Sequence, residues 1–372
     1  MYKDDFHLAE GCYLLNHSVG RALKSSQDDF NQHFFAPWQA SNKEPWQQWL
    51  AVISRFTTAL SLLFNSPSEQ FCPQVNLSSA LTKLVMSHPR LQQAGCKVLM
   101  AQSDFPSMGF AMQKALASGA KIEFIPEHVD LTDSAQWQPF IKADIDLVFI
   151  SHAYSNTGQQ APVAEISKLC KQVGCLSIVD VAQSAGVLPL NLSQVDVDFM
   201  IGSSVKWLCS GPGAAYLWVS KAQLSICEPQ DVGWFSHQNP FEFDIHHFAY
   251  HDTALRFWGG TPAIAPFVIA GHSMQYFALL GVDKVRAHNL ALLAQLTTEL
   301  APYVVSPVAP TKCSGTAIIN FAEQQTAILA ALTAADISVD MRAYGVRVSP
   351  HIYNDSADIE QLIKVVKRVL NK

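Results

Sequence analysis

Three short apolar runs between Leu176 and Ser220 constrain the fold of this chain more than any other feature. They begin at Leu176, Val197 and Ala214, and Gly, Pro or Ser bounds each of them. Runs of this length between turn-forming residues are typical of buried strands rather than helices. We therefore predict that the three runs are neighbouring buried strands of an α/β sheet.

One acid and one amine follow the first two runs. Asp180 ends the first run, and Lys206 comes shortly after the second. Open α/β sheets bind ligands outside the carboxyl ends of their strands, where these two side chains would lie. Loop acids and lysines are more often simply exposed to solvent, so position alone leaves both interpretations open.

The residues around this acid and amine resemble the class V aminotransferases, a family of fold-type-I pyridoxal-phosphate (PLP) enzymes. Asp180 to Gln183 read Asp-Val-Ala-Gln, which is similar to the family signature Asp-x-Ala-His or Asp-x-Ala-Gln. Ser203 to Lys206 read Ser-Ser-Val-Lys and stand where the family has its cofactor lysine. The resemblance implies pyridoxal 5'-phosphate as the cofactor and Ser203 as one of the residues that bind it.

The same resemblance implies a chemical role for each residue type. Lys206 would hold the cofactor as a Schiff base and later move the α-proton of the substrate. Asp180 would keep the pyridine nitrogen protonated, because a carboxylate against that nitrogen favours its charged form. Gln183 would donate a hydrogen bond to the ring oxygen. Lys206 and Asp180 are the predicted catalytic residues.

Composition is compatible with such an enzyme. Of the 372 residues, 15% are charged and 49% hydrophobic, and the net charge is −6, which favours a packed globular enzyme over a disordered or nucleic-acid-binding chain. We find no apolar run long enough to predict a membrane-spanning helix and no signal-peptide core. The eight cysteines are scattered and form no Cys-x-x-Cys pair, which predicts reduced thiols and a cytoplasmic location. His247 and His251 have i, i+4 spacing, but no third-ligand motif accompanies them, so we predict no metal.

Two segments before the three runs carry further candidates. Polar residues precede an apolar-periodic run at 77–84, which predicts a helix whose N-terminus suits a phosphate; the resemblance places the phosphate turn at Val75 and Asn76. Phe105-Pro106-Ser107 resembles a turn of the kynureninases, a class V group, in which an aromatic ring covers the cofactor. Phe105 would stack on the pyridine, although it could also be an ordinary core residue.

The loop at 151–159 again resembles that of kynureninases, which have a Thr-Gly-Gln sequence beside the cofactor. It makes Ser151 a candidate for cofactor binding. The loop also aligns, with one residue deleted, to the His-x-Ser-Asn loop of cysteine desulfurases, and Asn156 is a substrate-binding candidate in that register.

The remaining candidates lie near the two ends of the chain and after the three runs. Val-Gly-Trp-Phe at 232–235 resembles kynureninases, which implies that Trp234 reaches the cofactor phosphate. Thr261 stands in a Gly-Thr-Pro turn that, in the family, reaches the phosphate of the neighbouring subunit, so a homodimer with shared sites is implied. Arg347 would bind the substrate α-carboxylate, with Arg342 as its rival. His17 is either a substrate contact or a surface histidine.

The expected architecture is a large doubly wound domain with a mostly parallel sheet and a small C-terminal α/β domain. We expect an N-terminal segment at 1–40, the PLP-binding domain at 41–275 and the small domain at 276–372. Further predicted elements are a helix from Trp46 onward, strands at 97–100, 121–125 and 146–151, and helices at 108–119, 162–175, 262–280 and 282–300.

Three functions agree with these motifs. The first is kynureninase-like hydrolysis of a side-chain Cβ–Cγ bond or related lyase chemistry. The second is a class V transaminase or another PLP lyase. The third is a PLP-binding regulatory protein without turnover. Gln183 and Val205 depart from the kynureninases, which have His and Tyr there.

Overall fold

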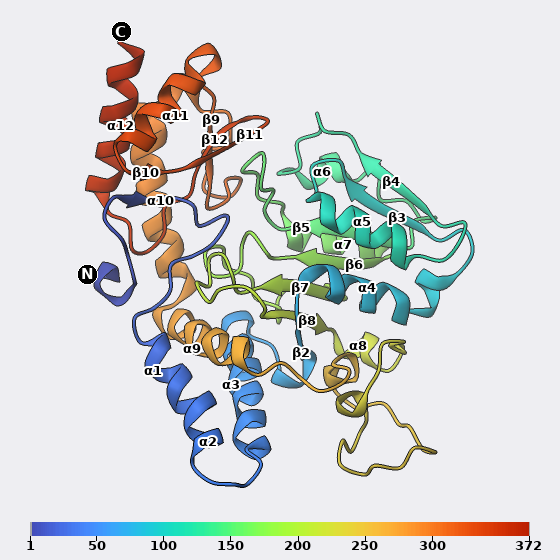
Figure 1. The fold of residues 1–372 in the computed structure, drawn as a ribbon. Coiled ribbons are helices and arrows are strands. Elements are labelled where there is room, and N and C mark those ends of the chain that lie inside the picture. Colours follow the sequence, from blue (N-terminus) through green and yellow to red (C-terminus); the bar gives the residue numbers. More distant parts are fainter. Residues whose placement is uncertain (1, 372) are drawn as a thin grey trace.

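The computed structural model describes residues 2–371, which form an α/β fold around a seven-stranded sheet (Figure 1). The strand order is β2-β8-β7-β6-β5-β3-β4, in which β8 pairs antiparallel with β2 and β7 and the other pairs are parallel. The predicted mostly parallel, mixed sheet is therefore confirmed. The strands are β2 (Phe71–Gln74), β3 (Lys97–Ala101), β4 (Lys121–Ile125), β5 (Leu147–Ser151), β6 (Leu176–Asp180), β7 (Phe199–Ser203) and β8 (Ala215–Val219).

The three apolar runs form adjacent central strands, as predicted. Every residue of β6 and β8 is buried, and only Ser203 at the end of β7 is partly exposed. Such strands carry apolar residues on both faces because helices cover both sides of the sheet. In register, Ser151 of β5 lies beside Asp180 of β6, which lies beside Ile201 of β7. The carboxyl ends of these parallel strands therefore meet at one edge.

Helices form two layers over the sheet (Figure 1). One layer contains α4 and α5, and the other contains α3, α7 and α9. The predicted helices are present, with α5 ending earlier than expected. The helices are α1 (Ser26–Phe30), α2 (Ala36–Gln39), α3 (Trp46–Phe64), α4 (Leu77–Ser87), α5 (Pro106–Ala115), α6 (Ser134–Trp137), α7 (Val163–Val173), α8 (Lys221–Leu224), α9 (Ala265–Leu280), α10 (Val282–Glu299), α11 (Gln325–Ala334) and α12 (Ser356–Leu370).

Helix α7 connects β5 to β6 and so places Asp180 at the sheet edge. Pro162 precedes its first residue, and Gly174 ends it in the left-handed conformation with a φ of 75°. Proline suits a helix start because the first amides have no helical partner, and glycine adopts positive φ without a steric cost. This crossover helix joins two parallel neighbouring strands, in the order of strand, helix and strand that the sequence predicts.

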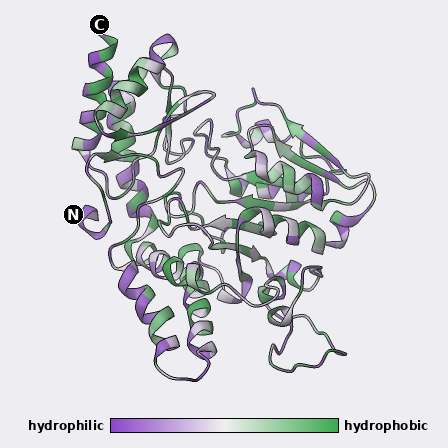
Figure 2. Cartoon of the chain, in the orientation of Figure 1, coloured by the Kyte–Doolittle hydropathy of each residue, from purple (hydrophilic) through white to green (hydrophobic). Residues whose placement is uncertain are grey.

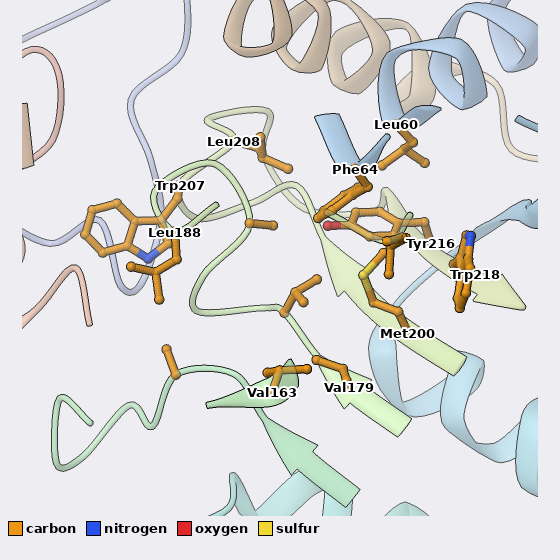
Figure 3. Packing of buried hydrophobic residues seen from close by; sticks show 14 of the residues in the cluster. Leu60, Phe64, Val163, Val179, Leu188, Met200, Trp207, Leu208, Tyr216 and Trp218 are labelled. Atoms are coloured by element: carbon orange, nitrogen blue, oxygen red, sulfur yellow. The ribbon is translucent and has the colours of Figure 1, made fainter. Parts of the chain in front are cut away.

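Alternate residues of the central strands point into different layers of the core. Val179 and Met200 pack with α3 and α9 on one face, whereas Ile178 and Phe199 pack with α4 and α5 on the other. Figure 3 shows the first cluster, in which the ring of Phe64 from α3 lies over Tyr216 of β8, with their centroids 5.8 Å apart. Figure 2 shows the same distribution as hydrophobic strands beneath helices with hydrophilic outer faces.

The C-terminal part has its own small sheet and core. Its strands are β9 (Ala317–Ile319), β11 (Asp340–Arg342) and β12 (Gly345–Val348), and α10, α11 and α12 contribute to its core. A separate pair joins β1 (Cys12–Tyr13) to β10 (Ile337–Ser338), so the N-terminal segment lies beside the C-terminal part. The boundary that we placed after residue 275 falls within α9, and the division into domains stays a prediction.

No single helix within residues 2–371 is long and apolar enough to span a membrane; α9 and α10 meet that test only together and are bent by 78°. Across the same residues, no group of three or more His, Cys, Asp or Glu side chains is arranged to hold a metal ion.

Candidate active site

A cleft of about 640 Å³ opens at the carboxyl ends of β5, β6 and β7. Lys206 lies in the loop three residues beyond β7, and Asp180 is the last residue of β6. The structure therefore brings together the acid and the amine that the sequence singled out. The cleft is lined by Leu77, Ser78, Ser103, Phe105, Ser107, Met108, Ser151, Ala153, Tyr154, Ser155, Asp180, Ala182, Gln183, Ser203 and Lys206.

Asp180 has one carboxylate oxygen that is fixed and one that is free of hydrogen bonds to the described residues. Its Oδ1 accepts a hydrogen bond from the Ala182 amide at 2.8 Å, and no side chain or amide of residues 2–371 bonds its Oδ2. Burial raises the pKa of Asp180, while the Ala182 amide and the charge of Lys206 oppose that shift. The free oxygen is available to a cationic group in the cleft, which would stabilise the ionised carboxylate.

The surroundings of Lys206 favour the neutral form of its amine. Burial lowers its pKa, Asp180 counteracts this, and the positive charge of Arg347 lowers it further. A lysine with a lowered pKa has a larger neutral fraction at neutral pH, which is the form that attacks a carbonyl or accepts a proton. The N-terminal segment packs closely against the loop of Lys206. The Gly20 amide donates to the Val205 carbonyl at 2.9 Å, and a side chain at Gly20 would collide with the Lys206 backbone.

Phe105 forms one wall of the cleft and faces the lysine. Its ring centroid lies 6.0 Å from Lys206 Nζ, and its side chain is half exposed. A core phenylalanine would be buried, so the exposed ring agrees better with the predicted role of covering a ligand. Asp104, directly before it, anchors the turn by accepting hydrogen bonds from the Ala101 amide at 2.8 Å and from Ser151 Oγ at 2.7 Å.

The N-terminus of α4 forms another side of the cleft. Leu77 and Ser78 of its first turn line the cleft, and Ser78 Oγ lies 2.9 Å from Ser107 Oγ. Free amides and hydroxyls at a helix N-terminus suit a phosphate. Asn76 is the N-cap, and its side-chain oxygen accepts from the Ser79 amide at 2.8 Å. Val75 and Asn76 thus precede the lining residues, and their phosphate role stays a prediction.

His17 and Arg347 lie behind the cleft lining and reach it through other residues. Gln183 Nε2 donates to the His17 carbonyl at 3.1 Å, and Arg347 Nη1 donates to the Ser155 carbonyl at 3.3 Å. Both side chains are buried, so His17 is not a surface histidine. Arg342, the rival of Arg347, is exposed on the outer part of the hairpin.

Besides Val75, Asn76, His17 and Arg347, three further predicted site residues do not line the cleft of this chain. Asn156 follows the lining residue Ser155 and is partly exposed. Trp234 packs on Trp46, with ring centroids 5.9 Å apart, and Thr261 is exposed. Their roles stay predictions.

Three side chains near the cleft were missed by reading the sequence. Tyr154 lines the cleft with a buried hydroxyl that has no hydrogen-bond partner among residues 2–371. Asp104 anchors the Phe105 turn, and Asp340 pairs with Arg347. Tyr154 and Asp104 adjoin motifs that the sequence analysis identified, so their positions could have indicated that they lie near the cleft. Asp340 depends on the register of a hairpin that the sequence alone did not give.

The donor set of the cleft fits pyridoxal phosphate. The free Oδ2 of Asp180 suits the ring nitrogen, and Gln183 keeps one amide N–H beyond the one that it donates to His17. The unpartnered hydroxyl of Tyr154 leaves a further polar atom for a ligand. The serines at the start of α4 and α5 suit the phosphate.

Comparison with solved structures places the fold among PLP enzymes. The chain superimposes on the cystine C-S lyase C-DES, solved with glycine covalently linked to its PLP cofactor, with a TM-score of 0.88, 21% identity and coverage of 99% of this chain and 98% of that one. It is also similar to a cysteine desulfurase from Thermococcus onnurineus NA1, with a TM-score of 0.87, 20% identity and coverage of 97% and 95%. These similarities show that the chain shares the fold of these proteins over nearly its whole length.

Sequence comparison identifies the family. The family model described as Aminotransferase class-V matches residues 76–362, which is most of the chain. The relatives include the uncharacterized aminotransferase YcbU of Bacillus subtilis, at 24% identity over 80% of this chain and 77% of that protein. They also include a kynureninase of Burkholderia mallei, at 25% identity over 78% and 71%. This chain belongs to the class V aminotransferase family, and its cofactor is pyridoxal 5'-phosphate.

Proposed function

We propose that this protein is a kynureninase-like enzyme that hydrolyses the Cβ–Cγ bond of an amino acid carrying a side-chain carbonyl, or carries out related lyase chemistry. The observation that carries this proposal is the position of Phe105. Its half-exposed ring faces Lys206 from the turn that resembles kynureninases. Kynureninases are also among the relatives of the chain.

The cysteines argue against a desulfurase despite the structural similarity. All eight cysteines are buried, and none lines the cleft. Burial raises the pKa of Cys12 and Cys72 to about 12, which leaves these thiols protonated at neutral pH. Cys313 lies against Arg286 in the interior, at 3.4 Å from its Nη2. No thiol is therefore placed to take sulfur from a substrate in the cleft.

When bound, the cofactor supplies an electron sink for charge that develops at the substrate Cα. Lys206 would hold the cofactor and, once released, accept and return protons at Cα, since its lowered pKa favours the neutral amine. Asp180 would hold the proton on the ring nitrogen through its free Oδ2. Phe105 would cover the ring and exclude water from that face.

Arg347 would bind the substrate α-carboxylate beside the loop of Ser155, and His17 would support this end of the site. Overall hydrolysis then breaks the Cβ–Cγ bond: the oxygen of water goes to Cγ, which becomes a carboxylic acid, and Cβ gains a proton to give alanine. Every amino acid carries the α-carboxylate that Arg347 would bind. Arg347 therefore does not distinguish substrates by their side chains.

A homodimer with shared sites is part of this proposal. Trp234 and Thr261 do not line the cleft of their own chain, and Thr261 is exposed and free to face a second copy. The loop between them exposes Phe241, Phe243 and Ile245, which a second copy would cover. We expect Thr261 to contact the phosphate of the partner's cofactor.

The runner-up function is transamination, which the relationship to YcbU favours. The two functions differ in their need for a keto acid. We would incubate the holoenzyme with a panel of amino acids that includes L-kynurenine, with and without pyruvate, and analyse the products. Alanine formed without pyruvate supports hydrolysis. Turnover that depends on pyruvate would contradict hydrolysis and indicate transamination. The third hypothesis, a PLP-binding regulatory protein without turnover, is disfavoured because the chain belongs to a family of enzymes.

A further inference from the structure

The hairpin β11–β12 pairs the predicted carboxylate-binding arginine with an acid of the same hairpin. Asp340 and Arg347 are cross-strand partners, so their side chains leave neighbouring strands side by side. Arg347 Nε donates to Asp340 Oδ1 at 2.8 Å, and Arg347 Nη2 pairs closely with Asp340 Oδ2. This is a bidentate ion pair along one edge of the guanidinium, with the arginine buried and the acid one-third exposed.

We propose that Asp340 is a positioning residue that fixes the guanidinium of Arg347 so that its remaining N–H groups meet the substrate carboxylate. This inference rests on the proposed function, since it assumes that Arg347 binds that carboxylate. Asp340 itself would not touch the reacting atoms.

Counting donors shows what the pair leaves for a substrate. A guanidinium has five N–H groups. Asp340 takes the Nε hydrogen and one on Nη2, and the Ser155 carbonyl takes one on Nη1 at 3.3 Å. One N–H therefore remains on each terminal nitrogen. A carboxylate that binds both of them needs the plane of the group to be fixed, which Asp340 and the Ser155 carbonyl do together.

His17 in turn fixes Asp340. His17 Nε2 lies 2.8 Å from Asp340 Oδ1, and its Nδ1 lies 2.6 Å from Ser349 Oγ. Burial lowers the pKa of His17, so the ring is neutral at neutral pH and donates from Nε2 to the carboxylate while Nδ1 accepts from the serine. Ser349 Oγ also lies 2.7 Å from Thr316 Oγ1, which anchors the network in the small sheet.

The network neutralises the charge of Arg347 without removing its hydrogen-bond donors. His17 and Arg347 hold the pKa of Asp340 well below its usual range, so Asp340 is ionised at neutral pH. A buried arginine without a partner acid would destabilise the protein. Asp340 thus pairs with the buried arginine and holds it in a fixed orientation.

The test compares binding of L-alanine with binding of L-alaninamide, which lacks the carboxylate. Binding to the holoenzyme is followed by the change in its visible absorbance, for the unmodified protein and for Asp340→Asn, Arg347→Gln and the double variant. Asp336→Asn is the matched control, because Asp336 is exposed and near the same hairpin.

If Asp340 acts through Arg347, Asp340→Asn should weaken L-alanine binding about tenfold and leave L-alaninamide binding within about twofold. In the Arg347→Gln background the same substitution should have almost no further effect, since the group that it positions is gone. Asp336→Asn should resemble the unmodified protein, also in its absorbance before addition of ligand.

The possible failures are distinguishable. Alanine is the product of the proposed reaction, so an unmodified holoenzyme that does not bind L-alanine contradicts the proposed function and, with it, this inference. If Arg347→Gln weakens L-alanine selectively but Asp340→Asn does not, the proposed function stands and the role of Asp340 is wrong. Equal losses for L-alanine and the amide in Asp340→Asn would indicate a merely structural residue, and tighter L-alanine binding would show that Asp340 competes with the substrate.

Discussion

The cleft at the sheet edge and the β11–β12 hairpin hold charged side chains in opposite ways. In the cleft, burial raises the pKa of Asp180 and lowers the pKa of Lys206, and one oxygen of the acid is left free of hydrogen bonds to the described residues. In the hairpin, Asp340 and Arg347 form an ion pair, and His17 and Arg347 hold the pKa of Asp340 well below its usual range. Groups that exchange protons need accessible neutral forms, whereas a group that only binds an anion must keep its charge.

Removal of the amine in the cleft should have the largest effect. Lys206→Ala should lose the covalent bond to the cofactor and lower turnover by about 10⁴-fold or more, because one side chain serves as both nucleophile and base. Borohydride reduction followed by peptide mass spectrometry should find the cofactor on Lys206 in the unmodified protein and nowhere in the variant. Lys221→Ala, on the exposed helix α8, is the control. A label on another lysine would place the active site elsewhere.

Asp180→Asn should have the next largest effect. The Asn oxygen can still accept from the Ala182 amide, but its NH₂ group would face the ligand in place of the free carboxylate oxygen. We expect the fold and part of the cofactor binding to remain, while turnover falls by about 10²–10³-fold. Steady-state kinetics on the saturated enzyme would measure this. Asp196→Asn, at an exposed acid, should change nothing; unaltered turnover in Asp180→Asn would make Asp180 a structural residue.

The two regions also differ in how well they could be predicted from sequence. Asp180 and Lys206 follow strands whose apolar runs are unmistakable, so their meeting at the sheet edge follows from parallel topology. Arg347 was found only through its motif. Asp340 was missed because a one-residue shift of the β11–β12 register would turn it to the other face. His17 lies more than 300 residues away from both, and no local pattern indicates that contact.

Arg347→Lys tests whether the arginine of the β11–β12 hairpin binds the substrate carboxylate. A lysine keeps the charge but loses the planar fork that pairs with Asp340 and the substrate. The apparent KM for the amino acid should rise about 10- to 100-fold while the amount of bound cofactor stays unchanged. Absorbance of the purified protein gives cofactor content, and initial rates give KM. Arg342→Lys on the exposed part of the same hairpin is the control; if it produced the substrate defect, the carboxylate site would belong to Arg342.

The smallest effect concerns Asp104, which lies beside the cleft. Burial raises its pKa to about 7, as it also raises the pKa of Asp180. The Ser151 hydroxyl and Ala101 amide oppose the shift in the pKa of Asp104, and nearby Asp180 adds to it. The ordinary pKa of an unfolded Asp is near 4. Between about pH 4 and pH 7 the folded protein therefore binds more protons than the unfolded chain, and Asp104 makes stability fall as pH rises through this window.

Asp104→Asn should remove that pH dependence. The amide oxygen can accept from the Ala101 amide while the NH₂ group donates to Ser151 Oγ, so both contacts survive. Because the residue is only partly buried, the gain at pH 8 should be about 1 kcal/mol in the free energy of unfolding of the apoprotein, with no gain at pH 4. Urea unfolding at both pH values, with exposed Asp4→Asn as the control, measures the difference. An equal gain at the two pH values would mean that the substitution improves packing and that Asp104 is ionised without penalty.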